Sequence, residues 1–158
     1  MNREETIEYL KKENIDFTII EHPAVFTVDE ADRLNLPHKE AHAKNLFIRD
    51  EKKRNYYLIT LKEDKVLDLK DLRRRFGTKP LSFASAEDLE KILGVKPGSV
   101  SALALLNDKE HAVHFFIDSE FQGGLVAAHP MENTATVFIR TDDLIYLVRK
   151  NGNDVTLL

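Results

Sequence analysis

Two short polar segments stand directly before strand-like apolar runs, and their side chains could do chemistry. Lys44 and Asn45 open one such run, at 46–48, while His129 and Asn133 precede another. A lysine ammonium attracts a phosphate or a carbonyl, and a histidine can relay a proton or orient a hydroxyl near neutral pH. Because lysine is seldom fully buried, Lys44 indicates an open cavity or an anionic partner. The alternative is that its stem covers apolar surface while its ammonium reaches water.

A glycine turn supplies a third chemical capacity. Gly98 follows Pro97 in a segment that reads as a turn. Such a turn can expose backbone N–H groups to an oxyanion. A cation, an oxyanion-binding turn and a histidine together suit hydrolysis of an ester on a phosphate-bearing molecule.

Other catalytic signatures are missing from the sequence. It contains no Gly-x-Ser-x-Gly elbow, no phosphate-binding Gly-x-x-x-x-Gly-Lys loop and no His-Glu-x-x-His. The absence of cysteine excludes disulfides, thiolate catalysis and cysteine-ligated metals. His111 and His114, three residues apart on an expected strand, point to opposite faces. We therefore expect neither a metal nor a cofactor.

The composition is that of a globular protein. With 158 residues, of which 42% are hydrophobic and 32% charged, the chain suits one domain spanning 1–158. No apolar run approaches the length of a membrane span, and the N-terminus lacks the apolar core of a signal peptide. We expect a cytoplasmic protein with no membrane partner.

The charge is acidic overall but locally basic. A net charge of -4 argues against indiscriminate nucleic-acid binding, although it says little about patches. Arg73, Arg74 and Arg75 lie in one basic segment, and 52–54 form another. These residues could contact a phosphate backbone, or they could be only a solvated helix face and turn.

The hydrophobic pattern predicts helices and strands in irregular alternation. Strands are expected at 15–20, from Lys44 to 48, 56–61, 102–106, 114–118, 125–128 and 135–139, with a short strand in the tail. Helices are expected before Asn14, over 30–34, 68–76 and 85–93, and over a last segment capped at 141–143. The predicted fold class is mixed α/β (α+β), with a mixed, mostly antiparallel sheet surrounded by helices.

Five segments, which run through nearly the whole chain, carry a resemblance to a known family. The chain resembles the bacterial free-standing aminoacyl-tRNA deacylases related to the editing insertion of prolyl-tRNA synthetase. It is especially similar to the branch that clears alanine from mischarged tRNA for proline. The matching segments are 22–28, 42–47, 81–85, 93–100 and 129–136.

The resemblance implies a compact editing domain that hydrolyses the ester between an amino acid and the terminal ribose of tRNA. It assigns catalytic roles to Lys44, Gly98 and His129, without a protein nucleophile, metal or cofactor. Lys44 would hold the terminal phosphate and ribose, and backbone N–H groups near Gly98 would meet the ester carbonyl. The implied substrate-binding residues are Thr27, Asn45, Ser99, Ser101 and Asn133.

The implied partner is the acceptor end of tRNA, in particular tRNA for proline, with Arg73, Arg74 and Arg75 as contacts. Prolyl-tRNA synthetase and an elongation factor are implied as transient partners. The chain departs from the family pattern at Ala41, Ala43, Ala102 and Leu103. Two alternatives therefore stand beside removal of alanine: deacylation of another mischarged tRNA, carrying cysteine or another small amino acid, and a non-catalytic module that binds aminoacyl-tRNA.

Overall fold

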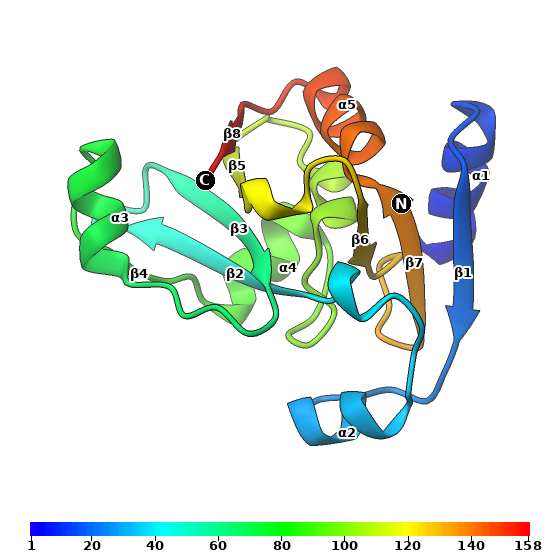
Figure 1. Ribbon diagram of the computed structural model, residues 1–158. Coiled ribbons are helices and arrows are strands. Elements are labelled where there is room, and N and C mark those ends of the chain that lie inside the picture. The colour runs from blue at the N-terminus through cyan, green and yellow to red at the C-terminus, as the bar shows by residue number, and fades with distance from the viewer.

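The computed structural model describes residues 1–158, the side chain of Val28 excepted. The α-helices are α1 (Arg3–Lys12), α2 (Val28–Arg33), α3 (Leu69–Phe76), α4 (Ala86–Leu93) and α5 (Thr141–Asn151), and the 3-10 helices are η1 (Lys39–Ala41), η2 (Ala102–Asn107) and η3 (Ser119–Phe121). The strands are β1 (Phe17–Glu21), β2 (Ala43–Asp50), β3 (Tyr56–Lys62), β4 (Leu81–Phe83), β5 (Val113–Ile117), β6 (Leu125–Ala128), β7 (Ala135–Arg140) and β8 (Val155–Leu157). Figure 1 shows the helices placed around the strands.

The strands form two sheets rather than the single sheet expected from the sequence. A three-stranded antiparallel sheet has the order β1-β7-β6, and a five-stranded sheet has the order β4-β2-β3-β5-β8. In the larger sheet β2 pairs antiparallel with β3 and β4, whereas β5 runs parallel to β3 and β8. The mixed, mostly antiparallel α/β class predicted from the sequence is thus confirmed, with its strands divided between two sheets.

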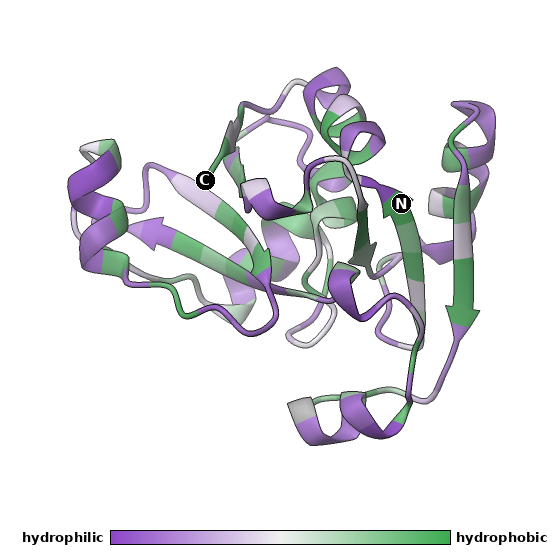
Figure 2. Cartoon of the chain, viewed as in Figure 1, coloured by the Kyte–Doolittle hydropathy of each residue, from purple (hydrophilic) through white to green (hydrophobic). Residues whose placement is uncertain are grey.

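The main hydrophobic core joins the two sheets. Phe47 and Phe115 from the larger sheet share one buried cluster with Val126 and Val137 from the smaller sheet. A second cluster lies on the other face of the larger sheet, where Leu72 of α3 is buried. Figure 2 shows the hydrophobic colouring concentrated along the strands. Both faces of the larger sheet are therefore covered, and its strands lack a polar face.

Helix boundaries follow the capping signals of the sequence. The side chains of Thr27, Asp68 and Ser85 accept backbone N–H bonds at the starts of α2, α3 and α4. Gly77 and Gly94 end α3 and α4 in the left-handed conformation, which costs glycine little. These helices are predictable because their ends are satisfied locally.

The segment 102–106, expected as a strand, is instead the 3-10 helix η2. An apolar run that is buried on all sides has no periodicity that separates a strand from a helix. A side-chain amide, not a strand ladder, binds the η2 backbone from outside: Asn151 Nδ2 of α5 donates to Leu105 O at 3.0 Å. At the end of η2, Asn107 Nδ2 donates to Leu93 O of α4. Asn151 and Leu93 lie in other elements, α5 and α4, so the local sequence does not reveal these contacts.

The start of α5 also differs from the prediction. Arg140 is the N-cap and makes no side-chain capping bond, and Thr141 is the first helical residue. The Thr141 hydroxyl donates to Phe121 O at 2.8 Å, which ties the helix to the loop before β6. The expected cap at 141–143 is therefore wrong, because a tertiary acceptor takes the hydroxyl.

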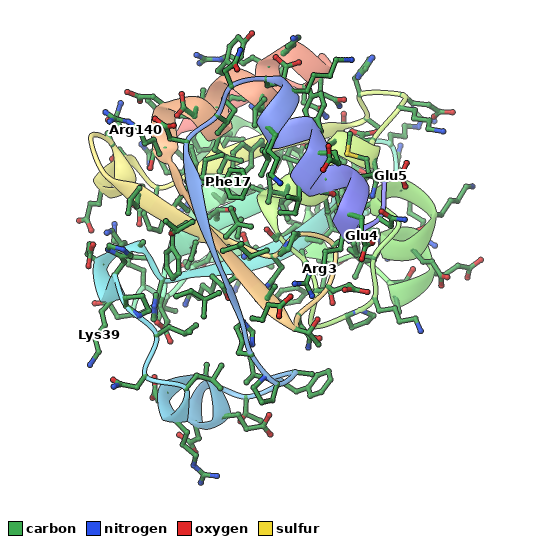
Figure 3. All side chains as sticks on the ribbon, turned by 90° about the vertical axis from the view of Figure 1, so that its right-hand side faces the viewer. Arg3, Glu4, Glu5, Phe17, Lys39 and Arg140 are labelled. Atoms are coloured by element: carbon green, nitrogen blue, oxygen red, sulfur yellow. The ribbon has the colours of Figure 1, made fainter. Side chains whose placement is uncertain are left out.

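The N-terminal helix buttresses the loop that follows β6. In Figure 3, α1 and β1 lie in front of the smaller sheet. Arg3 pairs with Glu21 at the end of β1 and lies 3.9 Å from Glu132. These contacts help to hold the 129–134 loop against the smaller sheet. No helix in the described part of the chain is both long and apolar enough to cross a membrane.

Asp118, at the end of β5, is a buried carboxylate that joins neighbouring segments. It accepts hydrogen bonds from Lys62 N, Lys65 Nζ and Glu120 N. Burial alone would raise the pKa of Asp118, but these hydrogen bonds outweigh it and lower the pKa below its ordinary value. The folded state therefore favours the ionised carboxylate.

We expect Asp118 to contribute to acid sensitivity of the fold. Because its folded pKa lies below the unfolded value of about 3.9, its stabilisation is present above that pH and is lost as the pH falls through the folded pKa. At neutral pH, Asp118→Asn should lower the free energy of unfolding by roughly 1–3 kcal/mol. It should also flatten the acid limb of a plot of stability against pH in urea titrations. The exposed neighbour Glu120 provides the control Glu120→Gln, and equal profiles for the two variants would contradict this role.

Candidate functional site

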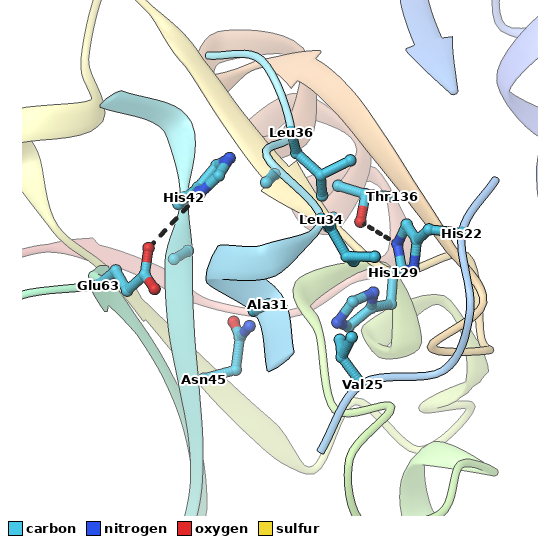
Figure 4. A pocket seen from close by; sticks show the side chains of 13 residues that line it. His22, Val25, Ala31, Leu34, Leu36, His42, Asn45, Glu63, His129 and Thr136 are labelled. Carbon is cyan, nitrogen blue, oxygen red and sulfur yellow. Dashed lines mark hydrogen bonds and ion pairs between the residues drawn. The ribbon is translucent and has the colours of Figure 1, made fainter. Parts of the chain in front are cut away.

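A small cavity lies between α2, the start of β2 and the strands β6 and β7. Its volume is about 110 Å³. Figure 4 shows histidines on two sides of it, with α2 between them. The lining residues are His22, Val25, Ala31, Leu34, Leu36, His42, Ala43, Asn45, Glu63, Ala127, Ala128, His129 and Thr136. The structure thus brings together Asn45 and His129, from the two polar segments noted in the sequence.

The pairing of β2 with β3 decides which of the first β2 side chains faces this cavity. Asn45 lies opposite Thr60, whose hydroxyl donates to Asn45 Oδ1 at 2.6 Å. Lys44 lies opposite Leu61, which belongs to the core cluster on the α3 side of the sheet. Successive side chains on a strand point to opposite faces. Asn45 therefore lines the cavity, and Lys44 does not.

Lys44 is half-buried on the other face of β2. Among the described side chains, none forms a hydrogen bond or an ion pair with its ammonium. A cation in this position can still receive an anionic partner from outside the chain. The role that the resemblance gives to Lys44 stays a prediction.

His129 is fixed at two points. Its backbone N–H donates to Ser101 Oγ at 2.9 Å, and its ring Nδ1 lies 3.1 Å from Ala135 O, to which it donates as the N–H tautomer. Burial lowers the pKa of His129, and nearby His22 lowers it further, against the opposing effect of the Ala135 bond. The ring is therefore neutral at pH 7, with Nε2 as an unprotonated acceptor.

His22 and Thr136 form the adjoining wall of the cavity. His22 Nε2 accepts from the Thr136 hydroxyl at 2.8 Å, while Nδ1 donates to Pro23 O at 2.8 Å. Both ring nitrogens of His22 are thereby occupied, and the ring is held rather than free to react.

His42 and Glu63 form the opposite wall. His42 Nε2 donates to Pro37 O at 3.1 Å, and His42 Nδ1 lies 3.5 Å from Glu63 Oε2. The backbone N–H of Glu63 donates to His42 O, which fixes the two residues side by side. In the described part of the chain, no three His, Asp or Glu side chains gather as they would around a metal ion.

Several residues predicted to bind substrate have structural contacts instead of a place in the cavity wall. Thr27 caps α2, and the Ser101 hydroxyl is bonded to the His129 backbone. Asn133 Nδ2 donates to Val25 O at 3.0 Å, and Ser99 is buried nearby in the turn after Pro97. Ser101 and Asn133 thus position the residues that do line the cavity.

Gly98 lies one layer behind the cavity. Its φ of +92° is one that side chains rarely adopt, and a Cβ there would lie 3.2 Å from the ring of Phe26 and 3.6 Å from Asn133 Nδ2. Glycine is therefore required for the close approach of this turn to the segment that carries Val25. The structure brings Gly98 beside the cavity wall but not into it.

The three arginines of α3 are exposed and distant from the cavity. Figure 1 shows α3 at the upper left of the molecule and α2, which lines the cavity, at the bottom. Arg74 lies 3.7 Å from Asp71, and the Arg75 guanidinium lies over the Phe76 ring. Any RNA that these arginines contact would lie outside the cavity.

Many residues of the cavity wall could not be predicted from the sequence. No local pattern singles out Glu63, and His22 and His42 stand out only as members of the matching segments. The sequence does carry a signal for His22 and His42, since 22–28 and 42–47 are among the segments that resemble the family. The position of Glu63, just after β3, follows only from strand pairing.

The chain matches known proteins over most of its length. Residues 22–147 match the family profile described as "Aminoacyl-tRNA editing domain". The chain is 38% identical to the Prolyl-tRNA editing protein ProX of Acetoanaerobium sticklandii, over 96% of this chain and 93% of the relative. It is also 38% identical to the Prolyl-tRNA synthetase associated domain-containing protein 1 of Mus musculus, over 89% and 85% of the two chains.

A solved structure supports the fold. The chain superposes with a TM-score of 0.73 on a crystal structure whose protein carries the provisional name of a trans-editing enzyme for prolyl tRNA synthetase. The match covers 100% of this chain and 97% of that chain, at 22% identity. At this identity the likeness establishes the shared fold.

We expect His129 to titrate at an unusually low pH. Its folded pKa lies below the unfolded value of about 6.5, so the unfolded state binds more protons between the two values and this group's contribution lowers stability as the pH falls below about 6.5. An NMR titration of the ring signals, assigned by their loss in His129→Gln, measures that pKa. A His129 ring that titrates at 6.5 or above would contradict the burial argument.

Proposed function

The chain belongs to the family of aminoacyl-tRNA editing domains, and from that premise we propose that it is a trans-editing hydrolase that removes alanine from mischarged tRNA for proline. The domain that acts would be the whole span 1–158. Water would attack the aminoacyl ester and release the amino acid and the free tRNA.

The size of the cavity is the observation that carries this proposal. Sites for drug-sized ligands usually enclose about 300–1,000 Å³, whereas this cavity has about 110 Å³. It suits a small acyl group and leaves the nucleotide outside. Overfilling a packed wall costs roughly 1–3 kcal/mol, which favours alanine over the larger proline.

The lining residues support selection by size. Val25, Leu34 and Leu36 supply bulk, and small alanines complete the apolar wall. Ala43, one of the departures from the family pattern, belongs to this wall, whereas Ala102 and Leu103 are buried in η2. Of the departures, Ala43 is therefore the one positioned to change which amino acid fits.

His129 is the residue best suited to handle a proton in this reaction. Its neutral ring has Nε2 available because Nδ1 is engaged with Ala135 O. In the proposed mechanism, Nε2 accepts a proton from the attacking water or from the free ribose hydroxyl. Asn45, oriented by Thr60, would hold the acyl group or that hydroxyl with its amide.

The remaining parts of the proposal concern the tRNA. Lys44 would meet a phosphate or the ribose of the acceptor end from the outer side of β2, and Gly98 would keep the 25–26 segment close enough to complete the pocket. We propose tRNA for proline as the specific partner and a cytoplasmic site of action. Prolyl-tRNA synthetase and an elongation factor would be transient partners.

A deacylation screen tests the function. Wild-type protein should hydrolyse alanyl-tRNA for proline and spare prolyl-tRNA. The screen also tests tRNAs charged with cysteine and serine. Lys44→Ala should lower kcat/KM by roughly 10- to 100-fold, the value of a charged hydrogen bond, with little change in thermal stability. Lys11→Ala, an exposed lysine on α1, is the matched control. Binding of charged tRNA without any hydrolysis would identify a binding module instead, and full activity of Lys44→Ala would remove this residue from the site.

A salt titration tests the arginines of α3. Replacing Arg73, Arg74 and Arg75 by glutamine should weaken tRNA binding and reduce the slope of log affinity against log salt. Binding with fewer phosphate contacts releases fewer counterions from the tRNA. Hydrolysis at saturating tRNA should persist because α3 is far from the cavity. An unchanged salt slope would mean that these arginines form only a solvated helix face.

A further inference from the structure

Glu63 is the only carboxylate among the described residues that line the cavity, and neither lysine nor arginine lines it. Seven of the thirteen lining residues are apolar, so a charge here has few polar neighbours. A charged group that is only partly exposed is stabilised by a partner of opposite sign or by hydrogen-bond donors. A ligand that enters the cavity could supply such a partner for Glu63.

Each of the other polar side chains of the wall has at least one hydrogen-bond partner within the chain. Thr136 is bonded to His22, Asn45 Oδ1 accepts from Thr60, and the His129 Nδ1 donates to the backbone. By contrast, no described residue donates a hydrogen bond to either carboxylate oxygen of Glu63, and its side chain is 35% exposed. Glu63 thus has acceptor capacity that the chain leaves unused.

His42 does not fill that capacity while its ring is neutral. A neutral imidazole carries one N–H, and the contact of Nε2 with Pro37 O assigns that proton to Nε2. Nδ1 then presents a lone pair to Glu63 Oε2 at 3.5 Å. No hydrogen bond joins His42 Nδ1 to Glu63 at this distance, so a cation or a donor of a ligand beside them could still bind the carboxylate.

The position of Glu63 suits a ligand that is partly in the cavity. Glu63, His42, Ala31 and Leu36 also line an adjoining cavity of about 270 Å³, so they form the wall shared by the two. The Glu63 backbone is bonded to His42 O, which holds the carboxylate at this junction. A ligand at the junction could place an apolar group in the small cavity and a cation against Glu63.

We propose that Glu63 recognises the α-ammonium group of the aminoacyl ester and is a specificity-determining residue of the site. The inference rests on the proposed function, because the ester of an amino acid carries an ammonium group one carbon from its carbonyl. An alanyl group has this cation and a single methyl group, which matches the carboxylate and the apolar wall. Glu63 would select esters of α-amino acids over uncharged acyl esters of the same size.

The test compares two substrates that differ in this one group. Lactyl-tRNA, obtained by deamination of alanyl-tRNA, carries a hydroxyl where alanyl-tRNA carries the ammonium. Wild-type protein should prefer alanyl-tRNA by roughly 10- to 100-fold in kcat/KM, the range expected for a charged hydrogen bond. Glu63→Gln should lose most of that preference by slowing hydrolysis of alanyl-tRNA while hydrolysis of lactyl-tRNA stays within about twofold. Glu40→Gln, an exposed glutamate of η1 that does not line the cavity, should keep the preference.

A binding measurement separates this inference from the proposed function. Amide-linked 3′-alanylamino and 3′-lactylamino derivatives of 3′-deoxyadenosine resist hydrolysis, so NMR titration gives their affinities directly. Tighter binding of the alanyl derivative by wild-type protein, lost in Glu63→Gln, supports the inference even if no ester is hydrolysed. Equal binding of the two derivatives by the wild type, or an equal fall in hydrolysis of both tRNAs in a folded Glu63→Gln variant, would overturn it. Absence of hydrolysis with the binding preference intact would overturn the proposed function alone.

Discussion

The hydrogen-bonded register between β2 and β3 is the constraint on which the site depends. It places Asn45 opposite Thr60 and Lys44 opposite Leu61. A shift by one residue would exchange the two faces, moving Lys44 toward the cavity and Asn45 toward the α3 side of the sheet. The same register brings Glu63, the residue after β3, beside His42, the residue before β2. This one strand pairing thus positions four of the thirteen lining residues, His42, Ala43, Asn45 and Glu63.

Four more lining residues come from the smaller sheet and the loop after β6. β6 and β7 carry Ala127, Ala128 and Thr136, and the loop between these strands begins with His129. The His129 backbone is bonded to Ser101, which lies at the start of the buried helix η2. Because the main core spans both sheets, the two walls are held at a fixed separation by the packing between them.

The electrostatics of the cavity depend on which ring nitrogens of its histidines carry a proton. The occupied nitrogens of His22 and His129 fix their tautomers, and burial keeps His129 neutral by lowering its pKa. With His129 neutral on that side, Glu63 is the source of negative potential on the other. This asymmetry gives a small acyl group a preferred orientation, with its cation toward Glu63 and its reacting carbonyl toward His129.

The sequence by itself determined the features that are satisfied locally. The caps at Thr27, Asp68 and Ser85, the glycine ends of α3 and α4 and the β2–β3 hairpin could be predicted because each depends on neighbouring residues. The ordered family segments also gave the reaction class and the pairing of Asn45 with His129 in one site. Tertiary structure alone decided what depends on distant partners. The Asn151 amide of α5 binds the backbone of η2, and strand alternation separated Lys44 from Asn45. The packing of the two sheets collected His22, His42 and Glu63 around one cavity, since no local pattern encodes which distant side chains will face the same space.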